Sequence, residues 1–234
     1  MKSFLAQTPK FVQRMFPKRI WAFPNDEKNI YLTFDDGPIP EVTPWVLDLL
    51  KKHQAKATFF CIGDNVKKHP EIFDRIVREG HAIGNHTFHH LNGRKTNHKD
   101  YLANVAKAQE VMESRVSNNT PGVLSSEVSK DCLHPSLFRP PYGQLTASQA
   151  RAIQQKGYKI VMWNVLSMDY DQKTNEETCF QNVAQNLHPG SIVVFHDSLK
   201  AQKNMRFALP KLLDLIDKKG WSCETIKEVE QSVN

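Results

Sequence analysis

Residues 30–38 read Ile-Tyr-Leu-Thr-Phe-Asp-Asp-Gly-Pro, an apolar, β-rich run that ends in two carboxylates and a Gly-Pro turn. Apolar side chains stand on both faces of the run 30–34, which is typical of a strand buried in a parallel sheet. No glycine-rich dinucleotide signature follows this strand. We therefore expect an α/β barrel rather than a doubly wound sheet.

Six further apolar runs follow the first, and stretches with the 3.6-residue periodicity of helices separate them. We expect strands at 30–34, 57–62, 81–84, 137–139, 159–165, 191–195 and 221–226. We expect helices at 41–53, 70–79, 100–115, 148–156, 176–186 and 207–219. Seven strands that alternate with helices predict a single α/β domain, in which helices cover the outside of a parallel sheet.

The composition is that of an ordinary globular chain, because 40% of its 234 residues are apolar and 24% are charged. The net charge is +6, but the sequence has no Lys/Arg run interleaved with aromatic residues, so we expect no nucleic-acid partner. The positive charge is compatible with a mildly acidic substrate or surface as a binding partner. The four cysteines stand far apart and are expected to be free thiols. The pattern carries no information on the oligomeric state.

We expect two parts in the chain, a basic N-terminal extension at 1–27 and a globular domain at 28–234. The first twenty residues hold five Lys or Arg side chains and no acid, but they lack the apolar run of about 7–15 residues of a secretory signal. A membrane-spanning helix needs about 20 consecutive apolar residues, and no stretch of the sequence is that long and apolar. We therefore expect a cytoplasmic protein, with a basic segment on a membrane surface as the alternative. The irregular stretch 117–135 predicts a long structural loop.

Titratable side chains follow five of the seven expected strands, at the edge where parallel α/β barrels carry their active sites. In strand order these groups are Asp35 and Asp36, then His86, His89 and His90, then Arg139 with Tyr142, then Asp169 with Tyr170, and finally His196 with Asp197. A helix face or a random surface would not sort them in this way. We therefore expect them to meet at one mouth of the barrel.

His86 and His90 are four residues apart, which places two imidazoles on one face of a helical turn. Two imidazoles and one carboxylate make a zinc site with an open position, and the same set suits non-haem iron. Asp35 and Asp36 could instead cap a turn. Two carboxylates in one pocket repel, however, unless a cation holds one of them. His89 leaves the choice of imidazole ligands open.

Arg139 precedes Pro-Pro-Tyr, so it is either a structural arginine on a rigid turn or a guanidinium held against a carboxylate. Tyr142 follows the two prolines, and its backbone N–H could be aimed at a ligand. His196 is either a satisfied strand-end histidine or an acid. A carboxylate from Asp169 nearby would favour its imidazolium form.

Four motifs occur in order across residues 30–226: Thr-Phe-Asp-Asp-Gly, His-Thr-x-x-His, Arg-Pro-Pro-Tyr and Phe-His-Asp. Together they resemble the polysaccharide deacetylases, also described as NodB-homology proteins or carbohydrate esterase family 4. The resemblance implies a distorted (β/α) barrel in residues 28–234 and a divalent metal cofactor, most often Zn²⁺. The metal ligands that it implies are Asp36, His86 and His90.

The same resemblance implies a role for each remaining polar residue at the mouth. Asp35 would be the general base, Arg139 would orient it, and His196 would be the general acid, tuned by Asp169. Tyr142 would supply a backbone N–H for the oxyanion.

One further position concerns the acetyl pocket, and two others depart from the family's pattern. Val194 stands where the family has an apolar wall near the acetyl methyl. Tyr170 stands where the family usually has a tryptophan, which implies a change in the acetyl pocket or in the subsite wall. Leu91-Asn92-Gly93 follows the second histidine where the family often has a proline, a change in the local loop.

The implied function is a metal-dependent hydrolase that removes acetyl groups, N-acetyl before O-acetyl, from a carbohydrate by means of a metal-bound water. One alternative is a hydrolase of the same fold that cleaves another non-peptide C–N bond. Others are an iron enzyme of oxygen chemistry and a glycan-binding homologue without activity. The acetylated carbohydrate partner could be peptidoglycan, a chitin-like oligomer, xylan or a small sugar.

Overall fold

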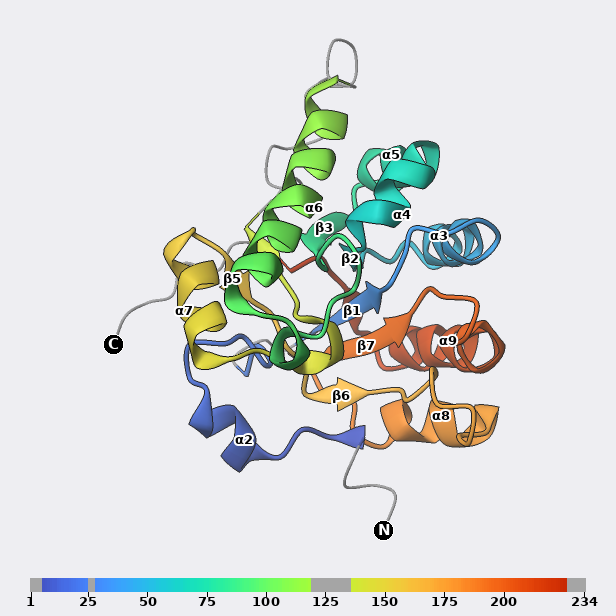
Figure 1. The fold of residues 1–234 in the computed structure, drawn as a ribbon. Helices are drawn as coiled ribbons and strands as arrows, with labels where there is room; N and C mark the ends of the chain where they lie inside the picture. The colour runs from blue at the N-terminus through green and yellow to red at the C-terminus, as the bar shows by residue number, and fades with distance from the viewer. Residues whose placement is uncertain (1–5, 25–27, 119–135, 227–234) are drawn as a thin grey trace.

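A computed structural model describes residues 6–24, 28–118 and 136–226 of the chain. Its strands are β1 (Asn29–Asp35), β2 (Thr58–Cys61), β3 (Ala82–Asn85), β4 (Leu137–Phe138), β5 (Lys159–Ile160), β6 (Val165–Leu166), β7 (Ile192–His196) and β8 (Ser222–Cys223). They pair in parallel in the order β5-β4-β3-β2-β1-β7-β6, and β8 adds to β1. The sheet curls into a distorted half-barrel (Figure 1).

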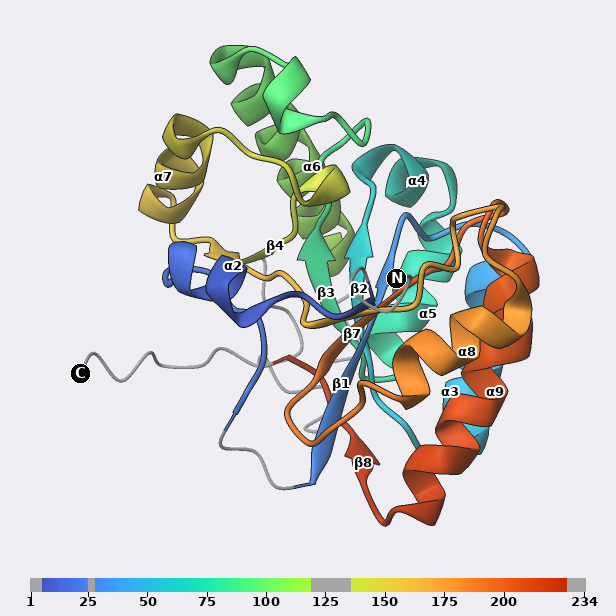
Figure 2. The ribbon, with the colours of Figure 1, turned by 90° about the horizontal axis from the view of Figure 1, so that it is seen from below.

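The helices wrap around the outside of this sheet (Figures 1 and 2). They are α2 (Lys10–Met15), α3 (Val42–Lys52), α4 (Gly63–Lys68), α5 (Pro70–Arg78), α6 (His98–Asn118), α7 (Ala147–Gln155), α8 (Glu176–Ala184) and α9 (Gln202–Lys218). Two short 3₁₀ turns, η1 (Gly93–Lys95) and η3 (Pro141–Gly143), lie between them. The expected single α/β barrel domain is confirmed.

Alternation along each strand separates the core from the interior of the barrel. On β1, Leu32 and Phe34 belong to the main apolar core under the helices. Thr33 and Asp35 face the other way and meet the side chain of Arg139. Both faces of the sheet are therefore buried, which explains why its strands read as continuous apolar runs.

The strand expected at 159–165 is wrong as a single element, because the chain there forms β5 and β6 at opposite ends of the sheet. The N-terminal segment covers the seam between them. The Ile20 N–H donates to the carbonyl of Ile160 at 2.9 Å, and the Thr8 N–H donates to that of Asn164 at 2.9 Å. The crossing residues stay apolar because this segment buries them, so their composition looks like that of a strand.

The expected helices are confirmed to within a few residues, with four differences. α9 begins at Gln202 rather than near 207, and it contains Pro210. The structure also has α2 and α4, which the sequence analysis does not predict, since six residues are too few for a clear period. α6 continues to Asn118, and the rest of the expected loop, 119–135, lies outside the described residues.

The cysteines that the structure describes, Cys61, Cys179 and Cys223, are free and buried, as expected. Cys132 lies outside the described ranges. Among the helices of those ranges, none combines the length and the apolar character that crossing a bilayer requires.

Candidate active site

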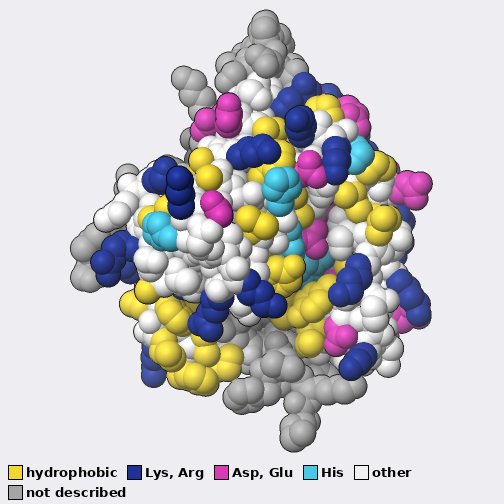
Figure 3. Space-filling view, in the orientation of Figure 1, with side chains coloured by type: hydrophobic (Ala, Val, Ile, Leu, Met, Phe, Trp, Pro, Cys, Tyr) yellow, Lys and Arg dark blue, Asp and Glu magenta, His cyan; other side chains and the backbone are white. Residues whose placement is uncertain are grey.

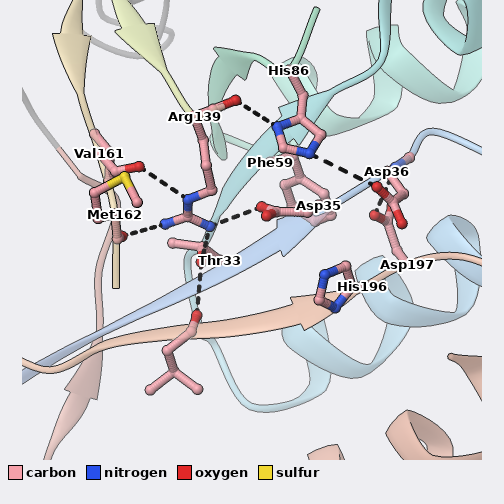
Figure 4. Close-up of polar contacts among 12 residues, drawn as sticks. Thr33, Asp35, Asp36, Phe59, His86, Arg139, Val161, Met162, His196 and Asp197 are labelled. Carbon is pink, nitrogen blue, oxygen red and sulfur yellow. Dashed lines mark hydrogen bonds and ion pairs between the residues drawn. The ribbon is translucent and has the colours of Figure 1, made fainter. Parts of the chain in front are cut away.

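The carboxyl ends of the strands bring the expected side chains to one mouth of the barrel (Figure 4). Asp35 ends β1 and His196 ends β7, and the two are register partners on neighbouring parallel strands. His86 directly follows β3, and Arg139 directly follows β4. Asp169 lies three residues beyond the end of β6. In the space-filling view, histidine and acidic side chains are visible in a hollow near the centre of this face (Figure 3).

Asp36, His86 and His90 form a candidate metal centre, in which one ligand atom from each lies within 4.8 Å of the others. The Oδ1 atom of Asp36 lies 3.8 Å from His86 Nε2 and 3.3 Å from His90 Nε2. This oxygen is buried, and no donor among the described residues bonds to it. A buried carboxylate oxygen without a partner, between two imidazole nitrogens, fits a divalent cation with an open coordination position.

The surroundings of His86 prepare it as a metal ligand. Its Nδ1–H donates to the carbonyl of Arg139 at 2.7 Å, which leaves the lone pair of Nε2 directed at Asp36. Burial lowers the pKa of His86 to about 4, so its imidazole is neutral at physiological pH. His89, the alternative ligand, is exposed, and its Nδ1 lies 3.1 Å from the side-chain amide of Asn104 on α6. The geometry therefore favours His86 and His90 over His89 as the imidazole pair of the candidate metal centre.

The loops around the mouth hold an unusual backbone conformation. Seven described residues other than glycine have a positive φ, and five of them are in these loops: Asp36, Thr87, His90, Tyr142 and Met168. Side chains rarely tolerate this region, and such residues gather at functional sites. The backbone strain therefore marks the same mouth as the polar side chains do.

Arg139 is fully buried, and its guanidinium holds Asp35 in place. It donates to Asp35 Oδ1 at 2.8 Å, to Thr33 Oγ1 at 2.6 Å and to the carbonyl of Met162 at 2.9 Å (Figure 4). Burial alone would raise the pKa of Asp35, but the charge of Arg139, with those of two histidines, holds it below its usual value. Asp35 is therefore an ionised carboxylate with a fixed orientation, as a general base requires.

His196 is held by Asp169 through two contacts. Asp169 Oδ1 accepts from Nδ1 of His196 at 2.8 Å, and its Oδ2 accepts from the backbone N–H of His196 at 2.7 Å. Burial alone would lower the pKa of His196, but the carboxylate of Asp169 raises it to about 9. The imidazole is thus protonated at neutral pH, and its Nε2–H is available to a substrate.

Three residues with expected roles in the acetyl pocket or the oxyanion site also lie at the mouth. Tyr142, in η3, is 61% exposed, and its ring packs against His90 with centroids 4.7 Å apart. The ring of Tyr170 meets that of His196 edge-on at 4.9 Å. Val194 is buried on β7, two residues before His196 and on the same face of the strand. The structure brings all three to the site, and their roles stay predictions.

Asp197 is a fully buried residue of the site for which the sequence predicts no separate role. Its Oδ1 accepts from the N–H of Gly37 at 2.9 Å, and its Oδ2 accepts from the hydroxyl of Thr43 at 2.5 Å. Its own N–H donates to the carbonyl of Asp35 at 3.1 Å. Asp197 therefore anchors the loop that carries both aspartates of the first motif. Its place directly after His196 in the last motif was the signal for it.

Asn104 on α6 has a similar supporting place for the histidine loop. Its Oδ1 accepts from the backbone N–H groups of Phe88 and His89 at 2.8 and 2.9 Å. Nothing in the sequence marks Asn104, because it is one polar residue among many on a long helix.

The chain is similar to several known proteins. A profile of the family "Polysaccharide deacetylase" matches residues 23–161. A peptidoglycan-N-acetylglucosamine deacetylase of Bacillus cereus is 34% identical over 218 residues, which cover 92% of this chain and 74% of that protein. A chitooligosaccharide deacetylase of Azorhizobium caulinodans is 34% identical over 172 residues, covering 74% and 75% of the two chains.

The solved structures show the same likeness. The crystal structure of the Bc1960 peptidoglycan N-acetylglucosamine deacetylase has a TM-score of 0.78 at 32% identity, and the match covers 94% of this chain and 95% of that one. A CE4 family pseudoenzyme from Bacillus anthracis, at 24% identity and a TM-score of 0.73, shares the fold over 89% of this chain and 67% of its own.

Proposed function

The chain belongs to the polysaccharide deacetylase family, carbohydrate esterase family 4, and on that premise we propose that it hydrolyses the N-acetyl group of N-acetylglucosamine units in peptidoglycan. The substrate class rests on the relatives that carry this name, at 34% and 33% identity. The observation that supports hydrolysis is the geometry of the mouth. An ionised Asp35 and a protonated His196 stand side by side at the ends of neighbouring strands, in the same mouth as the Asp36–His86–His90 centre.

Asp36, His86 and His90 would hold the divalent metal, which we propose to be zinc. Bound there, it would supply a Lewis acid that polarises the acetyl carbonyl and acidifies a water molecule. Asp35 would take a proton from the attacking water molecule while the oxygen of the water forms a bond to the acetyl carbon. Arg139 keeps the Asp35 carboxylate ionised and aimed at the mouth.

His196 donates the proton that the leaving sugar nitrogen needs when the C–N bond breaks, so that acetate and a free amine are the products. Asp169 holds the imidazolium in the orientation for this transfer. The backbone N–H of Tyr142 would stabilise the tetrahedral oxyanion. Val194 and Tyr170 would line the space of the acetyl methyl. The cytoplasmic location expected from the sequence stays a prediction.

The test is acetate release from purified peptidoglycan by metal-stripped enzyme, with and without added zinc. We expect release only with zinc, and a loss of about 10²-fold or more in the Asp35→Asn and His196→Ala variants. Release of acetate from chitooligosaccharides but not from peptidoglycan would overturn the substrate and keep the reaction.

The alternative is a non-catalytic homologue, because a solved structure with this fold is a pseudoenzyme. This chain has every residue type that the reaction needs at the mouth. If the wild type binds zinc but releases no more acetate from either glycan than the Asp35→Asn variant does, the glycan-binding alternative is favoured.

A further inference from the structure

A patch of exposed apolar side chains covers the outer face of α2. Five large apolar side chains are exposed among the described residues, and three of them, Phe11, Met15 and Phe16, lie within six positions of the N-terminal segment. Phe11 is 60% and Met15 is 65% exposed. Single exposed apolar residues are normal in globular proteins, but a cluster marks an interaction surface.

The patch is built on a fixed face of the protein. Val12 and Gln13 turn inward, where Val12 packs against an apolar cluster and Gln13 Nε2 donates to the carbonyl of Thr8 at 2.9 Å. The indole N–H of Trp21 donates to the carbonyl of Phe16 at 3.2 Å and holds the end of the segment. The helical period then leaves positions 10, 11, 14 and 15 on the outer face.

Basic side chains surround the apolar ones. Lys10, Arg14 and Lys18 are exposed beside them, and no Asp or Glu occurs in residues 1–25. We call Lys10, Phe11, Arg14, Met15, Phe16 and Lys18 the α2 patch. In Figure 3, hydrophobic side chains with basic ones around them occupy the lower left, where Figure 1 places α2.

We propose that the α2 patch docks the protein on the surface of an anionic lipid bilayer. Apolar side chains that enter the headgroup region, with cations around them that meet anionic lipids, are the chemistry of interfacial membrane binding. A second copy of the chain is a poor occupant, because two such patches face to face would bring like charges together.

The experiment is flotation of the full chain with vesicles of phosphatidylcholine containing about 30% phosphatidylglycerol, compared with pure phosphatidylcholine. We expect binding to the anionic vesicles that falls as salt is raised. Two double variants, F11S/M15S and K10E/K18E, should each lose at least about tenfold of this binding. The matched control K51E/K52E changes the charge by the same amount on the exposed end of α3 and should bind like the wild type.

Three outcomes would overturn the proposal. The first is no binding of the wild type to anionic vesicles at low salt. The second is equal binding by K10E/K18E and K51E/K52E, which would reduce the effect to net charge. The third is undiminished binding by F11S/M15S, which would make the α2 patch a general site for polyanions such as nucleic acid. Melting temperatures of all the variants near that of the wild type show that each is folded. None of these readouts depends on acetate release.

Discussion

The carboxylate of Asp197 occupies the space that a side chain at position 37 would need, because a Cβ atom on Gly37 would stand 2.0 Å from Asp197 Oδ2. The same carboxylate accepts the Gly37 N–H at 2.9 Å. The backbone next to Asp36 is thus packed directly on a buried acid, and the position of this proposed metal ligand depends on the fit.

Substitution of Gly37 by alanine should move the loop and weaken metal binding. We expect zinc affinity to fall about 10- to 100-fold, as it does when groups that support metal ligands are lost. Competition with a chelator measures it. Gly157→Ala is the control, since a Cβ there has no atom within 4 Å and its positive φ costs stability alone. Equal zinc affinity of G37A and G157A would contradict the role of the contact.

Substitutions of Asp197 should separate its two hydrogen bonds. D197A leaves the Gly37 N–H and the Thr43 hydroxyl without their acceptor and should cost about 2 kcal/mol or more of unfolding free energy. D197N keeps an acceptor oxygen for the Gly37 N–H but has an amide donor where Oδ2 accepts the Thr43 hydroxyl, so it should cost about 1 kcal/mol less than D197A. Urea unfolding compares the two variants, and equal losses would show that the bond to Gly37 does not contribute to stability.

Arg139 should set the acidic side of the pH–rate profile. Its charge lowers the pKa of Asp35 against the effect of burial, so its removal raises that pKa. The base is then protonated at a higher pH, and activity in R139M should fall off earlier as the pH decreases. R139K keeps the charge but not the several hydrogen bonds of the guanidinium, so it should lose kcat with a smaller shift. Identical acidic limbs in the two variants would refute this account.

Asp169 should set the alkaline side. The carboxylate raises the pKa of His196 to about 9, so the acid is protonated below that pH and loses its proton above it. In D169N the pKa should return toward the ordinary 6.5, and the alkaline limb of kcat should move down by about two pH units. NMR titration of His196 would measure the same change directly. An unmoved resonance would argue against the pairing.

The two adjacent histidines should differ in metal binding. His90 Nε2 lies 3.3 Å from Asp36 Oδ1, whereas His89 is exposed and bonds to Asn104. H90A should therefore lose zinc and activity, and H89A should keep both. Dialysis against a chelator should inactivate H89A as it does the wild type, and zinc should restore it. Retention of bound zinc by H90A would identify a different ligand set.

The sequence was informative where local pattern and local chemistry agree. β1 and β7 are short apolar runs, and the polar residues that end them, Asp35 and His196, are themselves residues of the candidate site. It was uninformative where distant segments meet. Ile20 pairs with Ile160 across 140 residues, and Asp197 supports Gly37 across 160, and nothing in the local sequence of either residue identifies its partner.

The family match begins at residue 23, but residues before this position already pair with the sheet. Residues up to Ala22 pair with the chain beside both free edges, at Val161 and at Val165, and also with Ser191. Unpaired edge strands add to strands of other molecules. A chain shortened to the start of the match would therefore keep its catalytic groups but expose both edges of the sheet. We expect such a chain to lose solubility and to aggregate by strand addition.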